Sequence, residues 1–346
     1  SWESGQDVSS RFGPQQTGGT IIQHVRPVDL QASMAQAAQI IARWATLLST
    51  ESALPNDEAH EETQAPALNF SAEAQSWAEV ANDFTVKTLL MWRDGWFRDY
   101  DSSVGEWSTQ QDAMHLAPVF CEVAGQGHIE HLREKLAQPP AHSSGWAPLS
   151  WPPVVMTLVG AADAARMPLD AAELAYRYID ASYRSTDRHE LDEQGGLPGV
   201  TREYRQTITV GKWGKTDYAN SGIEGYGWGA LSVHLLLRYL LGLREEEVGK
   251  ITIAPVLPQA LRRTGETYHV EPVPWGRYIL RIECTVKDAQ RYRLRLWCVV
   301  AAAGESLENA QKRVMQQEVE EHECEWEAEW GEGHTLQLPQ LTIASV

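Results

Sequence analysis

The spacing of apolar residues changes near Leu243, and this change constrains the fold more than any other feature of the chain. From Val28 to Leu243, apolar residues recur three or four positions apart between polar loops rich in Gly and Pro, which predicts helices. After Leu243, apolar and polar residues alternate, which predicts strands. Because the helices precede the strands, we expect two segregated parts: residues 1–243, mainly α-helical, and residues 244–346, a small antiparallel β domain.

Within the first part, a helix is predicted to begin after Asp29, because Asp is a favourable N-cap residue and apolar side chains follow at helical spacing. These apolar residues are Leu30, Met34, Ala37, Ile41, Trp44 and Leu48. Further helices are expected from near residue 71 and over residues 114–123, 129–136, 151–165, 170–184 and 228–241. The acidic, Ala- and Pro-rich residues 51–66 are predicted to form an exposed excursion between helices.

Within the second part, five runs rich in Val, Ile, Tyr and Trp are separated by Gly- and Pro-containing turns, as strands are. They are residues 250–255, 267–272, 277–287, 292–301 and 318–329. The last acidic run, residues 316–332, contains Trp326 and Trp330 and fits either an edge strand or a charged helix.

Composition excludes several classes of protein. The 29 basic and 47 acidic residues give a net charge of −18, which argues against binding to nucleic acid or to an anionic membrane. The four cysteines show no C-x-x-C spacing, so neither a zinc site nor a disulfide framework is indicated. Because no apolar run reaches about 18 residues, we expect a soluble protein, cytoplasmic or secreted. The 14 Trp residues are numerous and suit a wet, concave site where rings stack on a ligand.

Residues 2–12 combine a carboxylate, hydroxyls, Arg11 and aromatic rings in a short segment. A carboxyl such as Asp7 can exchange a proton with a glycosidic oxygen, and arginine and hydroxyl groups can bind sugar hydroxyls. The mixture therefore favours a sugar site. The structural alternative is that Ser9 or Ser10 only caps the following helix.

Two aromatic segments could line such a site. In residues 93–101, Asp99 and its neighbour Tyr100 follow Trp96, and an extended chain would direct Asp99 and Asp101 to opposite sides. The alternative is a charged turn between helices. In residues 145–153, Trp146 and Trp151 lie on a proline-rich loop that enters a helix, so they could form a stacking platform or support the loop from beneath.

A second candidate carboxylate, Glu203, follows a Gly- and Pro-rich turn and lies next to Arg202 and Tyr204. An adjacent arginine favours the ionised form of a carboxyl group, which suits a base that activates water. The structural alternative is a surface ion pair. Glu224 is a rival base, because it directly precedes a predicted helix whose N-terminus favours an anion.

Four stretches resemble, in the same order, motifs of trehalases, processing α-glucosidases and mannosylglycerate-hydrolase-like enzymes. Residues 3–12 match E-S-G-x-D-x-S-x-R-[WF], and residues 97–101 match F-x-D-Y-D. Trp146 and the pair at 151–152 match part of W-R-G-P-x-W-P-x-x-N. The fourth motif has two parts: residues 203–204 match the start of E-Y-Y-D-P, and residues 226–230 resemble a [FY]-x-W-[ST]-A helix start, with Gly229 in place of Ser or Thr. The resemblance covers residues 2–243.

The chain departs from these motifs at several positions. Gln6 stands where many members have tryptophan, Ala147 replaces an arginine and Val155 replaces an asparagine. The Y-D-P portion after Glu203 is replaced by residues 205–207, and the loop over residues 207–225 is longer than in closer relatives. Since two of the lost groups would bind substrate, we expect a substrate different from that of the best-known members.

The resemblance implies an inverting glycoside hydrolase that acts on an α-linked glucoside or mannoside, with Asp7 as general acid and Glu203 as general base, ahead of Glu224. It implies that residues 1–243 form the C-terminal part of an (α/α)6 toroid. Substrate-binding residues would be Arg11, Trp96, Asp99, Tyr100, Trp146, Trp151, Tyr204 and Trp228. No metal or organic cofactor is required.

A partial toroid has a further consequence, because helix faces at its open seam are left apolar and uncovered. The expected partner is therefore the N-terminal half of the same polypeptide or a partner chain. The altered residues Gln6, Ala147 and Val155 also support an alternative function: a sugar-binding or structural protein that keeps the glycosidase fold without turnover.

Overall fold

The computed structural model describes residues 24–51, 69–138, 149, 151–186, 204–210, 215–221, 228–247, 250–276, 278–300, 309, 312 and 322–338. The chain divides into two compact units. One consists of Ser1–Ala171 and Arg202–Tyr226, and the other of Ala172–Thr201 and Gly227–Val346. The sequence-based domain limits of 1–243 and 244–346 remain a prediction.

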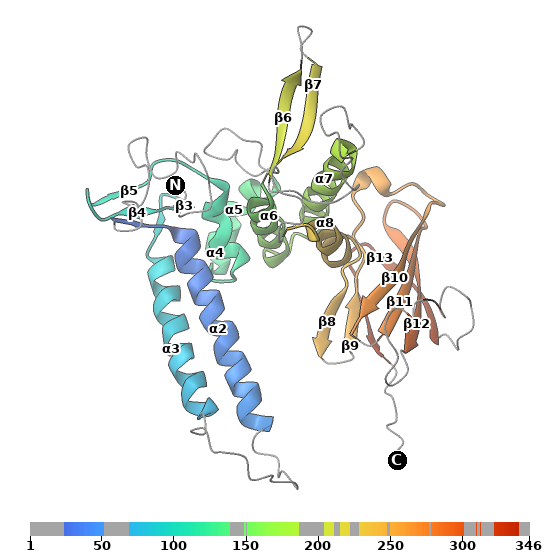
Figure 1. The fold of residues 1–346 in the computed structure, drawn as a ribbon, viewed down its shortest axis with the longest axis horizontal. Coiled ribbons are helices and arrows are strands. Elements are labelled where there is room, and N and C mark those ends of the chain that lie inside the picture. The colour runs from blue at the N-terminus through green and yellow to red at the C-terminus, as the bar shows by residue number, and fades with distance from the viewer. Residues whose placement is uncertain are drawn as a thin grey trace. The chain divides into compact units, whose positions relative to one another are not determined.

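Two long helices lie side by side in the first unit: α2, Val28–Glu51, and α3, Phe70–Leu89 (Figure 1). They confirm the first two predicted helices, but α2 begins at Val28, so Asp29 lies in its first turn and is not its N-cap residue. At the start of α3, the side chain of Asn69 accepts a hydrogen bond from the backbone N–H of Ala72, as an N-cap residue does.

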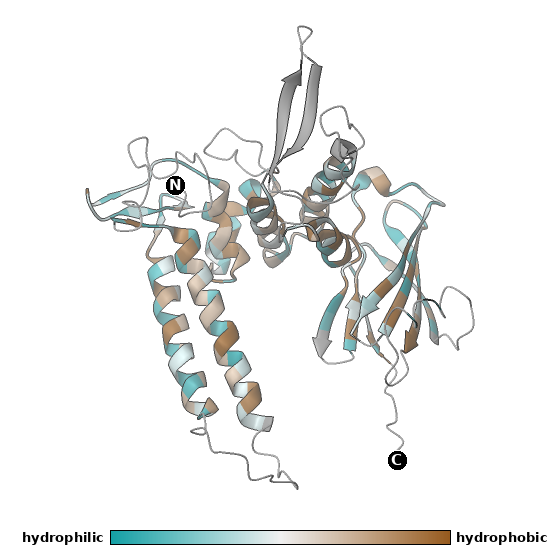
Figure 2. Cartoon of the chain, viewed as in Figure 1, coloured by the Kyte–Doolittle hydropathy of each residue, from teal (hydrophilic) through white to brown (hydrophobic). Residues whose placement is uncertain are grey.

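Helix α2 buries most of its alanines and exposes most of its large apolar residues. Ala32 and Ala35 are fully buried, in a cluster with Cys121 and Val123 against which Phe84 of α3 packs. The large apolar residues on the opposite side are exposed by 37–63%. They are Leu30, Met34, Ile41, Trp44 and Leu48, which we call the α2 stripe. Figure 2 shows the hydrophobic positions along α2 in brown. Alanine permits close approach of a neighbouring helix, which explains why the alanine face is the buried one.

The first unit also contains short strands that the sequence patterns did not predict. Strands β1 (Val25–Arg26), β4 (Tyr100–Asp101) and β5 (Glu106–Trp107) form an antiparallel sheet in the order β1-β4-β5. Strands β2 (Trp92–Arg93) and β3 (Trp96–Phe97) form a hairpin. Strands of two residues are too short to show an alternating pattern, so they escape a search based on period.

The remaining predicted helices are present with shifted ends. They are η2 (Ala113–Leu116), α4 (Ala117–Phe120), α5 (Gln126–Ala137), α6 (Pro152–Ala164), α7 (Pro168–Thr186) and α8 (Leu231–Leu235), which continues into the π-helical turn η4 (Leu236–Leu240). One expectation differs: part of the long loop expected over residues 207–225 is a hairpin of β6 (Tyr204–Val210) and β7 (Lys215–Ser221). A toroid remains a prediction.

The second unit contains the predicted antiparallel sheets. One is formed by β10 (Thr267–Trp275), β11 (Tyr278–Val286), β12 (Arg291–Val300) and β13 (His322–Glu329), in that order. The other is formed by β14 (His334–Gln337), β9 (Lys250–Ile253) and β8 (Arg244–Glu247), and the turn η5 (Gln259–Leu261) follows β9. The acidic run at residues 316–332 thus contributes an edge strand, β13, and not a helix.

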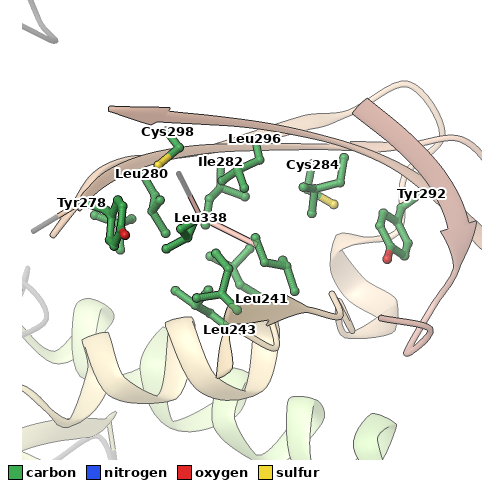
Figure 3. Packing of buried hydrophobic residues seen from close by; sticks show 14 of the residues in the cluster. Leu241, Leu243, Tyr278, Leu280, Ile282, Cys284, Tyr292, Leu296, Cys298 and Leu338 are labelled. Carbon is green, nitrogen blue, oxygen red and sulfur yellow. The ribbon is translucent and has the colours of Figure 1, made fainter. Parts of the chain in front are cut away.

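Alternate residues of β11 and β12 face a common core. Leu280, Ile282, Leu294 and Leu296 are at most 2% exposed and belong to one cluster with Leu241 and others (Figure 3). The intervening residues form ion pairs: Arg281 with Glu271, and Arg295 with both Glu283 and Glu325. The strand period therefore separates an apolar face from a charged one.

Candidate active site

Only some of the residues predicted to form the site lie within the described part of the chain. Asp7, Arg11, Trp146, Glu203 and Glu224 lie outside it. The described members are Trp96, Asp99, Tyr100, Trp151 and Trp228, and Tyr204 is described as the first residue of β6.

A tight hairpin positions the segment that contains Trp96, Asp99 and Tyr100. Asp94 and Gly95 join β2 to β3 with φ angles of +51° and +74°, the left-handed values that a type I′ turn requires. After β3, the guanidinium Nη1 of Arg98 donates to the carbonyl oxygen of Ser108 at 2.8 Å. The backbone N–H of Ser108 in turn donates to the carbonyl oxygen of Asp99 at 2.8 Å. These bonds tie residues 98–99 to the segment that follows β5.

Asp99 points into the interior, where its side chain is 2% exposed. Its Oδ1 accepts a hydrogen bond from the backbone N–H of Val28, the first residue of α2, at 2.8 Å. Its Oδ2 lies 3.0 Å from Nε2 of His115, a fully buried residue of η2. Both carboxylate oxygens are therefore engaged beneath the surface of the loop.

His115 has a second set of partners on its other ring nitrogen. The indole Nε1–H of Trp96 donates to Nδ1 of His115 at 3.0 Å, and the backbone N–H of Asp112 points to the same atom at 3.3 Å. Trp96 is itself only 2% exposed, so its ring lies in the core. Sequence reasoning missed His115, because no motif contains it; its position three residues after the N-cap residue Asp112 was the one available signal.

Tyr100 is partly buried and contacts a second aromatic residue that sequence reasoning also missed. It pairs with Arg26 of β1 and with Trp107 of β5, and the Tyr100 and Trp107 ring centroids are 4.8 Å apart. The guanidinium carbon of Arg93 lies 4.5 Å from the centroid of a Trp107 ring. The signal for Trp107 was the turn at residues 102–105 between two aromatic positions.

Trp151 occupies the N-cap position of α6 and is partly buried. The helix starts at Pro152–Pro153, where missing backbone N–H groups cost nothing. Val155, where the family motif has asparagine, donates its backbone N–H to the carbonyl oxygen of Trp151 at 3.0 Å and is fully buried. The Val155 side chain is therefore enclosed by the protein, as an apolar side chain usually is.

Trp228 belongs to the second unit. It lies in the turn before α8, where its carbonyl oxygen accepts from the backbone N–H of Leu231 at 2.9 Å. Tyr204 pairs with Ser221 across the β6–β7 hairpin.

Among the described residues, no group of three or more His, Cys, Asp or Glu side chains could hold a metal ion. The same part of the chain contains no helix that is long and apolar enough to cross a membrane.

Comparison with known proteins places these observations in a family. The sequence model of the trehalase family matches residues 1–240. This match spans all four motif regions and both candidate catalytic carboxylates. No curated protein sequence matches the chain.

Solved structures also match part of the chain. A mannosylglycerate hydrolase of family GH63 from Thermus thermophilus, in complex with Tris and D-glycerate, is 18% identical with a TM-score of 0.40. The match covers 61% of this chain and 45% of that chain. The neutral trehalase of Saccharomyces cerevisiae is 17% identical with a TM-score of 0.38, over 63% of this chain and 38% of that chain. The chain therefore spans less than half the length of these structures.

Proposed function

Because the chain belongs to the trehalase family, we propose that it acts as an inverting glycoside hydrolase on an α-linked glucoside or mannoside. The observation that carries this proposal is the family match over residues 1–240, which includes Asp7 and Glu203 in their motifs. A glycosidase reaction by inversion needs two carboxyl groups with different tasks, and the sequence offers one in each motif.

In this mechanism, the protonated carboxyl of Asp7 donates a proton to the leaving glycosidic oxygen. The ionised carboxylate of Glu203 removes a proton from a water molecule, which attacks the anomeric carbon from the opposite face. Room for that water requires carboxyl groups about 6.5–9.5 Å apart. Glu224 is the alternative base.

The remaining site residues are proposed to hold the sugar. Arg11 and Tyr204 are proposed to bind hydroxyl groups, and Trp146 and Trp151 to stack on sugar faces. For the Asp99–Tyr100 pair, the buried and doubly engaged carboxylate of Asp99 favours Tyr100 as the group that reaches a hydroxyl. We accordingly place Asp99 and Trp96 beneath the site, where they support Tyr100.

The exposed α2 stripe supports a proposal about partners. Trp44 is 63% exposed and Leu30 is 53% exposed, on a helix whose 24 residues include only three charged ones, Asp29, Arg43 and Glu51. An apolar face of this kind marks an interaction surface. We propose that further toroid helices cover it, supplied by an N-terminal half of the same polypeptide or by a partner chain.

Substitution of the two carboxylates tests the proposed reaction. Asp7→Asn keeps the side-chain shape but cannot donate a carboxylic proton, and Glu203→Gln cannot accept one from water. Each should lower kcat on α-linked disaccharides and on glucosyl and mannosyl glycerates by ~10²–10⁴. Sugar binding, measured by calorimetry, should persist. Asp288→Asn, at a surface turn of the second unit, is the matched control and should leave kcat unchanged.

Glu224→Gln, measured beside Glu203→Gln, identifies the base: the variant with the larger loss of kcat removes it. Retained hydrolysis in Asp7→Asn together with both glutamate variants would contradict the mechanism.

One observation favours the alternative of sugar binding without turnover. Val155, at a motif position that carries asparagine in related enzymes, is fully buried, so the chain lacks that polar group at this place. Unchanged binding of monosaccharides with no hydrolysis by the wild-type protein would support this alternative.

A further inference from the structure

A buried chain of hydrogen bonds connects three elements of the first unit. It runs from the indole of Trp96 in β3, through the ring of His115 in η2, to the carboxylate of Asp99, and ends at the backbone N–H of Val28 in α2. Trp96, His115 and Asp99 are each at most 2% exposed. Water therefore cannot replace these partners, and each lost bond would leave a buried polar group unpaired.

The partners of His115 determine where its proton lies. An indole N–H and a backbone N–H can only donate, so Nδ1 of His115, which faces Trp96 and Asp112, must be an acceptor without a proton. The proton is consequently on Nε2, 3.0 Å from Oδ2 of Asp99, to which it donates. The ring is thus a neutral imidazole in one tautomer, assigned from its hydrogen bonds.

This arrangement fixes the direction of the following residue. Successive side chains of an extended segment point to opposite sides, so an inward Asp99 directs Tyr100 outward. Tyr100 is then held between Arg26 and Trp107 by the pairing of β4 with β1 and β5. Loss of the bond to Asp99 would release the carboxylate from η2 and remove the constraint that orients Tyr100.

We propose that His115 is a positioning residue of the candidate active site, which holds Asp99 inward and thereby orients Tyr100 toward the sugar. The part that concerns sugar rests on the proposed function. His115 does not touch the substrate, because it is fully buried.

Two substitutions distinguish the hydrogen bond at Nε2 of His115 from the hydrogen bonds at its Nδ1. His115→Gln can place an amide N–H near the position of Nε2 and donate to Asp99. His115→Asn can place its oxygen near the position of Nδ1 and accept from Trp96 and Asp112, but it removes the donor to Oδ2 of Asp99. The proposal predicts that Asn disturbs Tyr100 and that Gln largely preserves it.

His128 provides a matched control. Its Nδ1 accepts from the backbone N–H of Gly125 at 3.1 Å, the same capping contact that His115 makes at η2. Its ring also lies near Trp92 and Phe97, but no carboxylate bond like that of His115 to Asp99 is described for it. His128→Asn should therefore leave Tyr100 undisturbed.

The readout is NMR of the full chain with 15N-labelled histidine and fluorinated tyrosine. The wild type should show His115 as the Nε2–H tautomer. The Tyr100 fluorine resonance should move and broaden in His115→Asn and stay near its wild-type position in His115→Gln and His128→Asn. An Nδ1–H tautomer would overturn the proposal, as would equal displacement of Tyr100 in the Asn and Gln variants, or no displacement in either.

Enzyme kinetics provide a second test of the positioning role of His115. In His115→Asn, kcat/KM should fall about tenfold or more because the tyrosine is misplaced, and the loss should disappear in a Tyr100→Phe background. If His115→Asn lowers kcat/KM by the same factor in the wild-type and the Tyr100→Phe backgrounds, His115 does not act by positioning Tyr100. Absence of hydrolysis by the wild type would count against the proposed function only, since the resonances decide the positioning role independently.

Discussion

Helix α2 of the first unit and strands β11 and β12 of the second have equally regular apolar periods, yet they use them in opposite ways. In the strands, alternate apolar residues such as Leu280 and Leu294 are buried in the unit's own core, and several of the positions between them are charged. In α2, the large apolar residues of the stripe are exposed, and four of the six alanines are buried. A period therefore identifies an element and an apolar face, but it does not tell whether the chain itself covers that face.

The largest expected effect concerns a glycine that the second unit requires. Gly242 ends the helix of α8 and η4 with a φ angle of +63°, and a Cβ added there would lie 2.2 Å from the carbonyl oxygen of Ala254. Gly242→Ala combines left-handed strain with a backbone clash, so it should cost about 3 kcal/mol or more of unfolding free energy.

A glycine of the first unit is the control for this prediction. Gly105 has a φ angle of +73°, but an added Cβ would meet nothing within 4 Å. Gly105→Ala should cost only about 1 kcal/mol, from backbone strain. Chemical denaturation of both variants measures the difference. Similar costs would show that the close contact at Gly242 is relieved by movement of residue 254.

A matched pair of leucines tests the comparison directly. Leu280→Ala removes a fully buried side chain and should cost about 3 kcal/mol. Leu30→Ala removes a side chain that is 53% exposed on α2 and should cost at most about 0.5 kcal/mol, because Leu and Ala have similar helix propensities. Urea unfolding of the chain would measure both costs. A large cost for Leu30→Ala would mean that this chain already covers the α2 stripe.

Alkaline pH should have a smaller effect, mostly on the second unit. Burial raises the pKa of Cys284 and of Cys298 from 9.0 to about 12, and it raises the pKa of Cys121 in the first unit to about 11. Above pH 9, the unfolded thiols lose protons that the folded protein retains. The free energy of unfolding should therefore fall as pH rises from 9 toward these folded pKa values.

In Cys284→Ala, the free energy of unfolding should decrease less steeply with pH than in the wild type, by up to about 1.4 kcal/mol per pH unit. Leu280→Ala, which removes a buried side chain without a thiol from the same core, serves as the control and should leave the slope as it is. Denaturation at pH 8, 9 and 10 provides the measurement, and an equal slope in wild type and Cys284→Ala would refute the assignment.

Much of the secondary structure was predictable, because the spacing of apolar residues and the turn residues determine helices and strands over short stretches of the chain. The helices α2, α3, α5, α6 and α7 follow from the sequence pattern, and the edge strand β13 was one of the two alternatives that the pattern left open for residues 316–332. The choice of the buried face of α2 did not, because it depends on how closely α3 can approach Ala32 and Ala35. The β6–β7 hairpin was missed because no two-residue turn signal marks it.

The sequence motifs identified candidate residues for the site, but they did not predict how these residues are buried or which groups they contact. The motif around Tyr100 singled out this loop as part of the candidate site, but it gave Asp99 and Tyr100 the same role. The burial of Asp99 depends on His115, which is 16 residues away in the sequence and belongs to no motif. Contacts of this kind arise from tertiary packing, which spacing along the chain does not encode.

The most direct test of the central claim is to follow the anomeric form of the sugar first released from an α-linked substrate. Proton NMR during hydrolysis distinguishes the two anomers before they equilibrate. Direct attack of water, activated by Glu203 while Asp7 protonates the leaving oxygen, predicts that the β-anomer appears first. Release of the α-anomer first would show net retention through two displacements and would contradict the inverting mechanism proposed for this chain.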